Sequence, residues 1–356
     1  MAEQRIRAAR IFTGEHWLYN HTVVIEDKRI TAVIPNQDSS YDVHTLLPAF
    51  VDIQLYGAHE RLLAVYPDAA TIHAIHAYCK AGGAGFFLPT VATNHDAVIR
   101  QCIDAVREYW QEGGEGCIGL HIEGPWLHPK RRGAHIESII HAPTMEEVQS
   151  LLTYGKDAIK MITLAPEVCD AAIIDYIQAQ GVIVSAGHSD ADYTTATKAF
   201  DLGISTVTHL YNAMSPLQHR APGLVGAVFN HPTVRASIIP DGYHVDYAAI
   251  RIAKKMMGSR LFAITDAVTT TSKGYYPHQP AGDKYESNGI LSGSALTMHQ
   301  CMRNLIDHVG VDEAEAIRMC SLYPAAVLRM EDVLGKIETG YTASFCITDE
   351  ALALIP

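Results

Sequence analysis

Hydrophobic and polar residues alternate along the first forty-odd positions of the chain. Residues 5–14 read RIRAARIFTG and residues 21–35 read HTVVIEDKRITAVIP, with Gly14 and the pair Asp27 and Lys28 at the expected turns. Side chains that alternate with a period of two are typical of half-buried strands. The N-terminal segment is therefore predicted to form a small β-module.

From residue 47 onward the pattern changes to short apolar runs separated by longer segments with helical spacing. The eight runs are LPAFVDIQ (47–54), GAGFFLPT (83–90), CIGLHI (117–122), AIKMITLA (158–165), GVIVSAG (181–187), ISTVTHL (204–210), VRASIIP (234–240) and RLFAITD (260–266). Several intervening segments begin with Asp or Asn and end with Gly, as helices often do. This alternation predicts an α/β fold, the (β/α)8 TIM barrel, whose strands are buried on both sides.

The last segment, VLGKIETGYTASFCITD at 333–349, is again strand-like. Because a barrel brings its own two ends close together, this segment is expected to join the N-terminal module. The predicted organisation is a small β-sandwich domain from residues 1–46 and 333–356 and a catalytic barrel from 47–332. Two long interruptions, 126–144 and 268–293, follow the third and eighth strands, and loops of this length are usually lids or mobile segments.

Composition and charge narrow the possible partners. Of the 356 residues 48% are hydrophobic and 19% charged, which is an ordinary globular balance, and the net charge is −12. This charge repels phosphate backbones and anionic membranes, so a small-molecule partner is expected rather than nucleic acid or membrane. An anionic substrate would then need a locally basic pocket.

The seven cysteines are scattered and never form C-x-x-C, which argues against a disulfide framework or a zinc ribbon. No apolar stretch approaches the roughly 18 residues that span a bilayer. The first ten residues also lack the apolar region of a secretory signal. A soluble, cytoplasmic protein is therefore expected.

Four polar residues stand where predicted strands end. Glu123 ends the third strand, His188 follows the fifth, His209 the sixth and Asp266 the eighth. Active sites of TIM barrels are built at these carboxyl ends. Two imidazoles and one carboxylate with an open fourth position form a catalytic zinc site, and such a site lowers the pKa of a water to about 7. Asp266 is then free to move protons.

Other histidines have simpler interpretations. The chain has 19 of them, so a single histidine can reach a strand end by chance. His121 shares the face of Glu123 on its strand, and we expect it in a lower layer or orienting a ligand. The run from Lys130 to Arg132 is most simply a solvated loop, although it could draw an anion to the mouth. Solvated positions are expected for His95, His128, His141 and His219.

Eight short motifs are spread along the predicted barrel: GLHIEGPW (119–126), GAH (133–135), SAGHSDA (185–191), THLYNAMSP (208–216), RAPGLVG (220–226), PDGYH (240–244), ITDA (264–267) and LSGSALTM (291–298). Together they resemble the N-acetylglucosamine-6-phosphate deacetylase family of the amidohydrolase superfamily. The resemblance runs nearly the whole length of the chain in the family's order. It implies a TIM barrel with a small β-sandwich from both chain ends, and hydrolysis of N-acetylglucosamine 6-phosphate to glucosamine 6-phosphate and acetate.

The same resemblance implies roles for individual residues. The metal ligands would be Glu123, His188 and His209, and the acid/base would be Asp266. His135 would hydrogen-bond the acetyl carbonyl. The sugar phosphate would be held by Asn212, the backbone of Ala213, Arg220 and His244, and the rest of the pocket would be lined by Ala134, Leu291, Ser292 and Gly293. The family further implies a homodimer, in which a phosphate contact can come from the partner subunit.

One departure from the superfamily concerns the metal. Many amidohydrolases bind a second metal through an H-x-H pair on the first strand and a lysine on the fourth, whereas this chain has Asp52-Ile53-Gln54 and MITLAPE there. Lys160 lies too early in its strand to substitute. One divalent metal per subunit is therefore expected, with Zn²⁺ the default and Fe²⁺, Co²⁺ or Mn²⁺ able to use the same ligands.

Two alternatives stay open from the sequence. A related amidohydrolase could act on another N-acylated sugar or amino acid, in which case Arg220 and His244 would lack an obvious purpose. A non-catalytic barrel could serve as a scaffold, but it would not need four polar strand-end residues gathered at one mouth.

Overall fold

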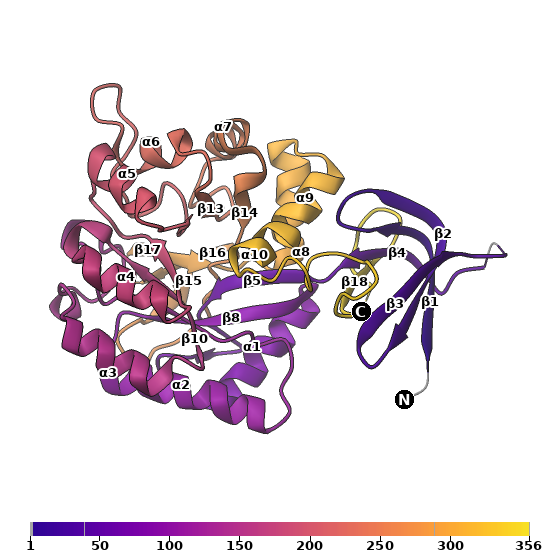
Figure 1. The fold of residues 1–356 in the computed structure, drawn as a ribbon, viewed down its shortest axis with the longest axis horizontal. Coiled ribbons are helices and arrows are strands. Elements are labelled where there is room, and N and C mark those ends of the chain that lie inside the picture. Colours follow the sequence, from indigo (N-terminus) through magenta and orange to yellow (C-terminus); the bar gives the residue numbers. More distant parts are fainter. Residues whose placement is uncertain (1–2, 39, 288, 356) are drawn as a thin grey trace.

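The structure is a computed structural model that describes residues 3–38, 40–287 and 289–355. Eight parallel strands form one sheet in the order β14-β13-β12-β11-β10-β9-β8-β5 (Figure 1). Their bounds are β5 Phe50–Leu55, β8 Ala84–Ala92, β9 Leu120–Glu123, β10 Ile159–Leu164, β11 Ile183–Ala186, β12 Thr206–Val207, β13 Arg235–Ile238 and β14 Leu261–Ala263. A parallel bridge between Leu55 and Ala267, just beyond β14, joins the two edges. The barrel closes as predicted.

Helices surround the barrel (Figure 1). They are α1 Ala69–Ala81, α2 Asp96–Gln111, α3 Met145–Gly155, α4 Ala171–Ala179, α5 Tyr193–Asp201, α6 Gly223–Asn230, α7 Tyr247–Met257, α8 Met298–Asn304, α9 Glu313–Cys320 and α10 Leu322–Val327. Short 3-10 turns lie at Pro129–Arg131, Glu137–Ile139, Pro166–Val168 and Gly258–Arg260, and a π-helical turn lies at Leu305–Val309. Asp68 and Asp192 cap α1 and α5 by accepting from backbone N–H groups, which explains where these helices begin.

Both chain ends contribute to a separate five-stranded sheet, in the order β18-β4-β1-β2-β3. Its strands are β1 Gln4–Phe12, β2 Trp17–Glu26, β3 Arg29–Pro35, β4 Val43–Pro48 and β18 Phe345–Thr348. The sheet has a small core of its own, which includes Ile11, Val23 and Leu46. Strand β4 crosses the predicted domain boundary at residue 46 and continues, after Ala49, into β5.

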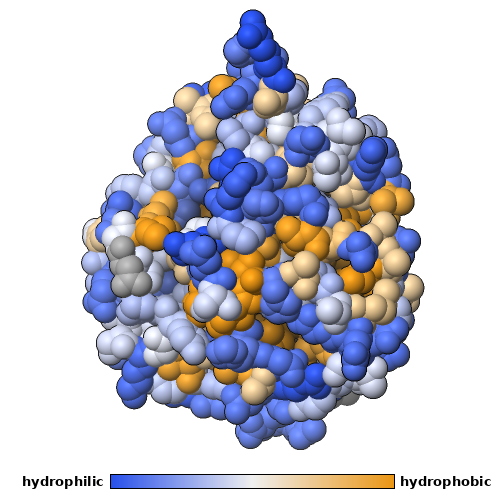
Figure 2. All heavy atoms as spheres, turned by 90° about the vertical axis from the view of Figure 1, so that its left-hand side faces the viewer, coloured by the Kyte–Doolittle hydropathy of each residue, from blue (hydrophilic) through white to orange (hydrophobic). Residues whose placement is uncertain are grey.

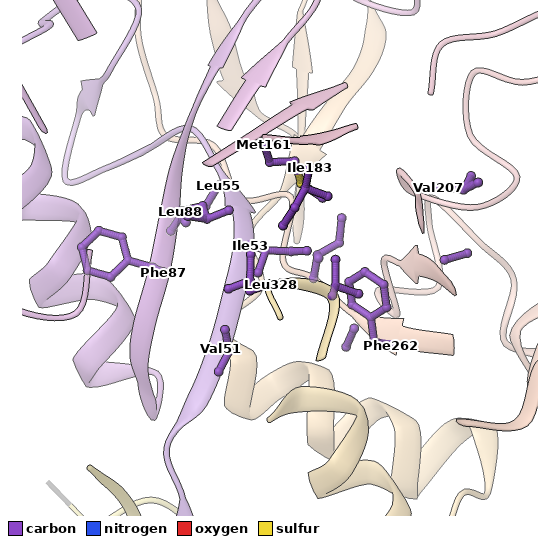
Figure 3. Packing of buried hydrophobic residues seen from close by; sticks show 14 of the residues in the cluster. Val51, Ile53, Leu55, Phe87, Leu88, Met161, Ile183, Val207, Phe262 and Leu328 are labelled. Atoms are coloured by element: carbon purple, nitrogen blue, oxygen red, sulfur yellow. The ribbon is translucent and has the colours of Figure 1, made fainter. Parts of the chain in front are cut away.

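The position of this sheet fixes which end of the barrel is free. Because β5 runs directly away from β4 and all barrel strands are parallel, the carboxyl ends of the strands lie at the end opposite to the terminal sheet (Figure 1). The barrel and its helices share one large apolar cluster. Figure 3 shows part of this cluster, with labelled side chains Val51, Ile53, Leu55, Phe87, Leu88, Met161, Ile183, Val207, Phe262 and Leu328.

The long segment after the eighth strand is more ordered than the sequence pattern indicated. It contains an antiparallel sheet of β15 His278–Pro280, β16 Lys284–Ser287 and β17 Ile290–Ser294. A smaller hairpin, β6 Gly57–Ala58 and β7 Arg61–Leu62, follows β5. Among the helices described, none has the length and apolar character that a membrane span requires.

Candidate metal centre and active site

A cavity of about 190 Å³ opens at the carboxyl ends of the barrel strands. Figure 2 shows the corresponding face, where hydrophobic residues gather near the centre and hydrophilic residues surround them. The predicted site residues that line the cavity are Glu123, Ala134, His135, His188, His209, Asn212, Ala213, His244, Asp266, Leu291, Ser292 and Gly293. Residues more than 150 positions apart in the sequence are thus brought to one mouth.

Three of these residues form a compact triangle of ligand atoms. Oε1 of Glu123 lies 3.2 Å from Nε2 of His188 and 3.1 Å from Nε2 of His209. The two imidazole nitrogens lie 3.0 Å apart. Tetrahedral zinc with bonds of about 2.0–2.1 Å separates its ligand atoms by roughly 3.3 Å, close to these values. The three predicted ligands therefore fit a single divalent cation.

The second ring nitrogen of His188 supports this interpretation. Its Nδ1 lies 2.8 Å from the backbone carbonyl of Arg131, which can only accept, so Nδ1 carries the proton. Nε2 is then left with a lone pair directed toward Glu123 and His209. A metal-binding histidine is commonly oriented by such a bond. Burial lowers the pKa of His188 to about 4, which keeps the ring neutral.

His135 is a second candidate for the third ligand. Ligand atoms of Glu123, His135 and His188 all lie within 4.8 Å of one another. However, Nδ1 of His135 accepts from the backbone N–H of Thr93 at 3.3 Å, so its proton lies on Nε2. That nitrogen lies 3.2 Å from Oε2 of Glu123. A protonated Nε2 donates rather than binds a metal, which favours a hydrogen-bonding role for His135.

A hydrogen-bond network links Glu123 to Asp266. Nε2 of Gln54 lies 2.8 Å from Oδ1 of Asp266 and 3.2 Å from Oε1 of Glu123. The hydroxyl of Tyr56 lies 2.5 Å from Oε2 of Glu123, and burial raises the pKa of this phenol well above its ordinary value. The Gln54 amide nitrogen thus donates toward both carboxylates and links them.

Backbone geometry turns the functional side chains into the mouth. His188, His209 and Asp266 have φ values of 48°, 37° and 54°. This left-handed region is uncommon for residues other than glycine and costs of order 1–3 kcal/mol each. A strained backbone conformation persists only where the surrounding structure fixes it. The backbone N–H of Asp266 donates to the carbonyl of Gln54 at 2.9 Å, which anchors this residue at the closing seam of the barrel.

Burial and charge set the ionisation of the two carboxylates in opposite directions. Burial acts to raise the pKa of Glu123, but the imidazoles of His188, His135 and His209 outweigh it and hold that pKa well below its ordinary value. Burial raises the pKa of Asp266, and the charge of Glu123 adds to this shift. Glu123 is thus a permanent anion, whereas Asp266 binds a proton more readily, as an acid/base must.

Other residues that line the cavity offer hydrogen-bonding groups for an anion. Nδ1 of His244 lies 2.6 Å from Oδ2 of Asp241, a carboxylate that also accepts from the backbone N–H of Tyr243 and His244. Asn212 and Ala213 line the same cavity. Together with His244, they are the cavity groups that could hydrogen-bond an anionic substrate.

Arg220 is the exception among the predicted site residues. It is exposed at the tip of a tight hairpin, closed by hydrogen bonds between the backbones of Gln218 and Ala221. Among the residues that the structure describes, Arg220 neither lines the cavity nor has a hydrogen-bond or ion-pair partner. The loop of residues 216–221 projects from the molecule near α6 (Figure 1). Its predicted phosphate contact stays a prediction for this chain.

Two cavity residues from the segment after β14, Tyr276 and His278, were not predicted from the sequence. The buried His278 has its Nδ1 2.9 Å from Oγ of Ser292, and burial lowers the pKa of His278 to about 4. The Tyr276 hydroxyl donates to the carbonyl of Thr93 at 2.6 Å. Both side chains line the cavity, so β15 to β17 forms part of its wall. For Tyr276 and His278, the only sequence signal was the unusual length of the loop.

The remaining predictions concern neighbours of the site. His121 is buried with Nδ1 3.1 Å from the carbonyl of Ile53 and Nε2 2.8 Å from Oγ1 of Thr163, which matches a lower-layer position. The run from Lys130 to Arg132 pairs with Asp190 and Glu137. Its clearest tie to the site is the Arg131 carbonyl that orients His188. His95, His141 and His219 are exposed, and His128 is half-buried.

Comparison with known proteins agrees with this geometry. The Amidohydrolase family matches residues 45–355, and the NagA composite domain matches residues 7–46. The N-acetylglucosamine-6-phosphate deacetylase of Haemophilus influenzae is 33% identical over 95% of this chain and 93% of its own length. The N-acetylgalactosamine-6-phosphate deacetylase of Escherichia coli O157:H7 is 32% identical over 98% of this chain and 95% of its own.

Solved structures give the same result. The crystal structure of N-acetylglucosamine-6-phosphate deacetylase from Pasteurella multocida is similar with a TM-score of 0.92 and 32% identity, covering 99% of this chain and 97% of that one. The family match spans most of the chain, and the relatives align with it nearly end to end. This chain belongs to the amidohydrolase family.

Proposed function

We propose that this protein hydrolyses the acetamide of N-acetylglucosamine 6-phosphate, giving glucosamine 6-phosphate and acetate. The observation that carries the proposal is one cavity lined by the Glu-His-His cluster, by Asp266 and by His244, which is paired with Asp241. Full-length relatives with deacetylase names support it. An amide-cleaving centre and an anion site are the two features that such a substrate needs.

One divalent cation, with zinc the default, would be held by Glu123, His188 and His209. When bound, it supplies an activated water and polarises a carbonyl oxygen. The site's own residues do the rest. His135 donates from Nε2 to the acetyl oxygen as that oxygen gains negative charge, a contribution that reaches roughly 3–4 kcal/mol in comparable sites.

Asp266 moves the proton. Its carboxylate takes a proton from the water as the water oxygen attacks the carbonyl carbon, and it then delivers that proton to the amide nitrogen as the C–N bond breaks. Gln54 holds Asp266 in place through the hydrogen bond to Oδ1. The raised pKa of Asp266 favours both halves of this transfer, since an acid/base works best when its pKa is close to the working pH.

The substrate phosphate would bind to His244, Asn212 and the backbone of Ala213. Arg220 is exposed outside the cavity of its own chain, and we propose that it reaches the phosphate bound by a partner subunit in a homodimer. A guanidinium matches phosphate in a bidentate manner, so its contribution to affinity would be large. This arrangement gives the projecting loop of residues 216–221 a purpose.

A second candidate substrate is N-acetylgalactosamine 6-phosphate. It is favoured by the relative from Escherichia coli O157:H7, whose identity of 32% is nearly the same as that of the Haemophilus enzyme. The two sugars differ only in the orientation of one hydroxyl. A non-catalytic scaffold would leave the buried cluster without a role.

The test is acetate release from N-acetylglucosamine 6-phosphate, N-acetylgalactosamine 6-phosphate and unphosphorylated N-acetylglucosamine. We expect a preference of at least about 100-fold in kcat/KM for a phosphorylated sugar, because a charge-assisted phosphate contact contributes about 1.5–3 kcal/mol and several are made. Arg220→Ala should largely remove this preference. Equal turnover of phosphorylated and unphosphorylated sugars would overturn the phosphate site.

A further inference from the structure

Tyr56 lies just after β5, and its hydroxyl sits between the two carboxylates of the site. The hydroxyl oxygen is 2.5 Å from Oε2 of Glu123 and 3.3 Å from Oδ1 of Asp266. Nε2 of Gln54 is 2.8 Å from the same oxygen. The tyrosine is buried in a small apolar cluster with Leu62, Val268 and Tyr276. Its position is therefore set by packing, independently of any ligand.

The direction of each hydrogen bond follows from the available protons. Nε2 of Gln54 can only donate, so the Tyr56 oxygen accepts from it. The single phenolic proton then goes to the nearer carboxylate oxygen, Oε2 of Glu123. An O–H···O⁻ bond of about 2.5–2.7 Å is a charge-assisted bond of the stronger kind. Tyr56 is thus a donor to the outer oxygen of a metal-ligand carboxylate.

The two oxygens of Glu123 have different partners. Oε1 faces Nε2 of both His188 and His209, at 3.2 and 3.1 Å. Oε2 faces Tyr56 at 2.5 Å and Nε2 of His135 at 3.2 Å. We propose that Tyr56 is a positioning residue that restrains Glu123 to bind the cation through Oε1 alone. This inference rests on the metal centre of the proposed function.

The restraint has a chemical purpose. A carboxylate without it can rotate and present both oxygens to the cation, which fills the position that a water or a substrate oxygen must enter. Donation to Oε2 also fixes the carboxylate before the cation arrives, so less ordering is needed on binding. Loss of such an outer partner typically weakens metal affinity by about 10–100-fold.

Tyr56→Phe tests the proposal because it removes the hydroxyl and keeps the ring. The matched control is Tyr78→Phe, which removes a hydroxyl that donates to the Leu296 carbonyl at 2.7 Å outside the cavity. Zinc affinity of each apoprotein is measured by competition with a chromophoric chelator, and the Tm of each is measured with and without zinc. We expect Tyr56→Phe to weaken zinc binding about 10–100-fold, with little change in the apoprotein Tm, and Tyr78→Phe to leave zinc affinity unchanged.

Zinc binding by Tyr56→Phe as tight as that of the wild type would overturn the proposal. So would a loss of apoprotein Tm as large as the loss in the zinc-loaded form, because the hydroxyl would then be structural only. Binding is measured without substrate, so a wild type that binds zinc but releases no acetate refutes the deacetylase activity and not the role of Tyr56. A wild type that binds no zinc overturns both.

Discussion

At the scale of single residues, the three imidazoles around Glu123 differ in the hydrogen-bond partner of Nδ1, the ring nitrogen that faces away from Glu123. Nδ1 of His188 donates to the Arg131 carbonyl, and Nδ1 of His135 accepts from Thr93. Within the described part of the chain, the buried Nδ1 of His209 has no partner. Burial acts to lower the pKa of His209, but its hydrogen bond to Glu123 and that carboxylate's charge outweigh burial and raise it. His209 therefore holds a proton that a metal must displace.

The raised pKa of His209 predicts that zinc binding releases about one proton at about pH 6, which is below the ordinary histidine pKa. The reason is that a metal binds only the deprotonated imidazole. A raised pKa means that the proton stays bound to higher pH, so zinc affinity should fall about tenfold for each pH unit below that pKa. At a pH well above the pKa of His209, zinc binding should release no proton. Calorimetric titration of the apoprotein with zinc in two buffers of different ionisation enthalpy measures the proton count. Zero release at about pH 6 would contradict the assignment of His209.

The sequence predicted the residues whose position depends on strand ends. Glu123, His188, His209 and Asp266 each follow a short apolar run, and parallel strands in a barrel bring such positions to one mouth. Tyr56 could not be predicted in the same way. Its contacts depend on how the backbone turns after β5 and on which carboxylate oxygen faces the cation. The local pattern of hydrophobic and polar residues determines neither.

At the scale of elements, the seam between β14 and β17 controls where Asp266 stands. The Ser294 backbone N–H donates to the Asp266 carbonyl at 3.0 Å. Gly293 precedes it with φ of 125°, and a Cβ there would lie 2.5 Å from Cγ1 of Val268 and 3.0 Å from the Asp266 carbonyl. The close approach of β17 to the strand end therefore requires glycine at this position.

Gly293→Ala should push β17 away from Asp266 and lower kcat by at least about tenfold, since a misplacement of 1 Å can cost about 100-fold. Gly289→Ala is the matched control, because Gly289 also has a positive φ of 77° but no atom within 4 Å of its Cβ position. Both variants should lose about 1–2 kcal/mol from backbone strain, but only the first should lose activity. Tm and kcat measured on both separate the two effects. Equal loss of kcat would show that strain, and not the clash, is responsible.

The periodicity of the chain predicted the eight strands and the order of elements, because buried parallel strands are continuous apolar runs. It did not predict the sheet of β15 to β17. The strands of that segment are short and largely polar. The segment is held by a small apolar cluster that includes Val268 and Tyr276 and by the hydrogen bond between Tyr276 and Thr93. Of residues 333–349, only Phe345–Thr348 is a strand.

At the scale of the whole molecule, the net charge and the position of Arg220 both bear on how the substrate phosphate is bound. The chain carries a net charge of −12, yet its proposed substrate is an anion, so positive groups must be concentrated at the phosphate end. His244 is in the cavity, whereas Arg220 projects from the surface on the hairpin of residues 216–221. A two-fold dimer can place a projecting arginine over the partner's cavity, because each subunit then both gives and receives the same contact.

Subunit mixing tests this arrangement. Arg220→Ala and Glu123→Gln are each expected to be nearly inactive alone, the first through the lost phosphate contact and the second through the lost metal ligand. In a mixed dimer, the subunit with an intact Glu123 receives Arg220 from its partner, so one of its two sites is complete. Random exchange makes about half of the dimers mixed, and activity should recover to about a quarter of the wild-type value. Co-expression of the two variants, followed by an assay of acetate release, measures this recovery. If Arg220 served its own cavity, every mixed dimer would combine two defective sites, and no activity would return.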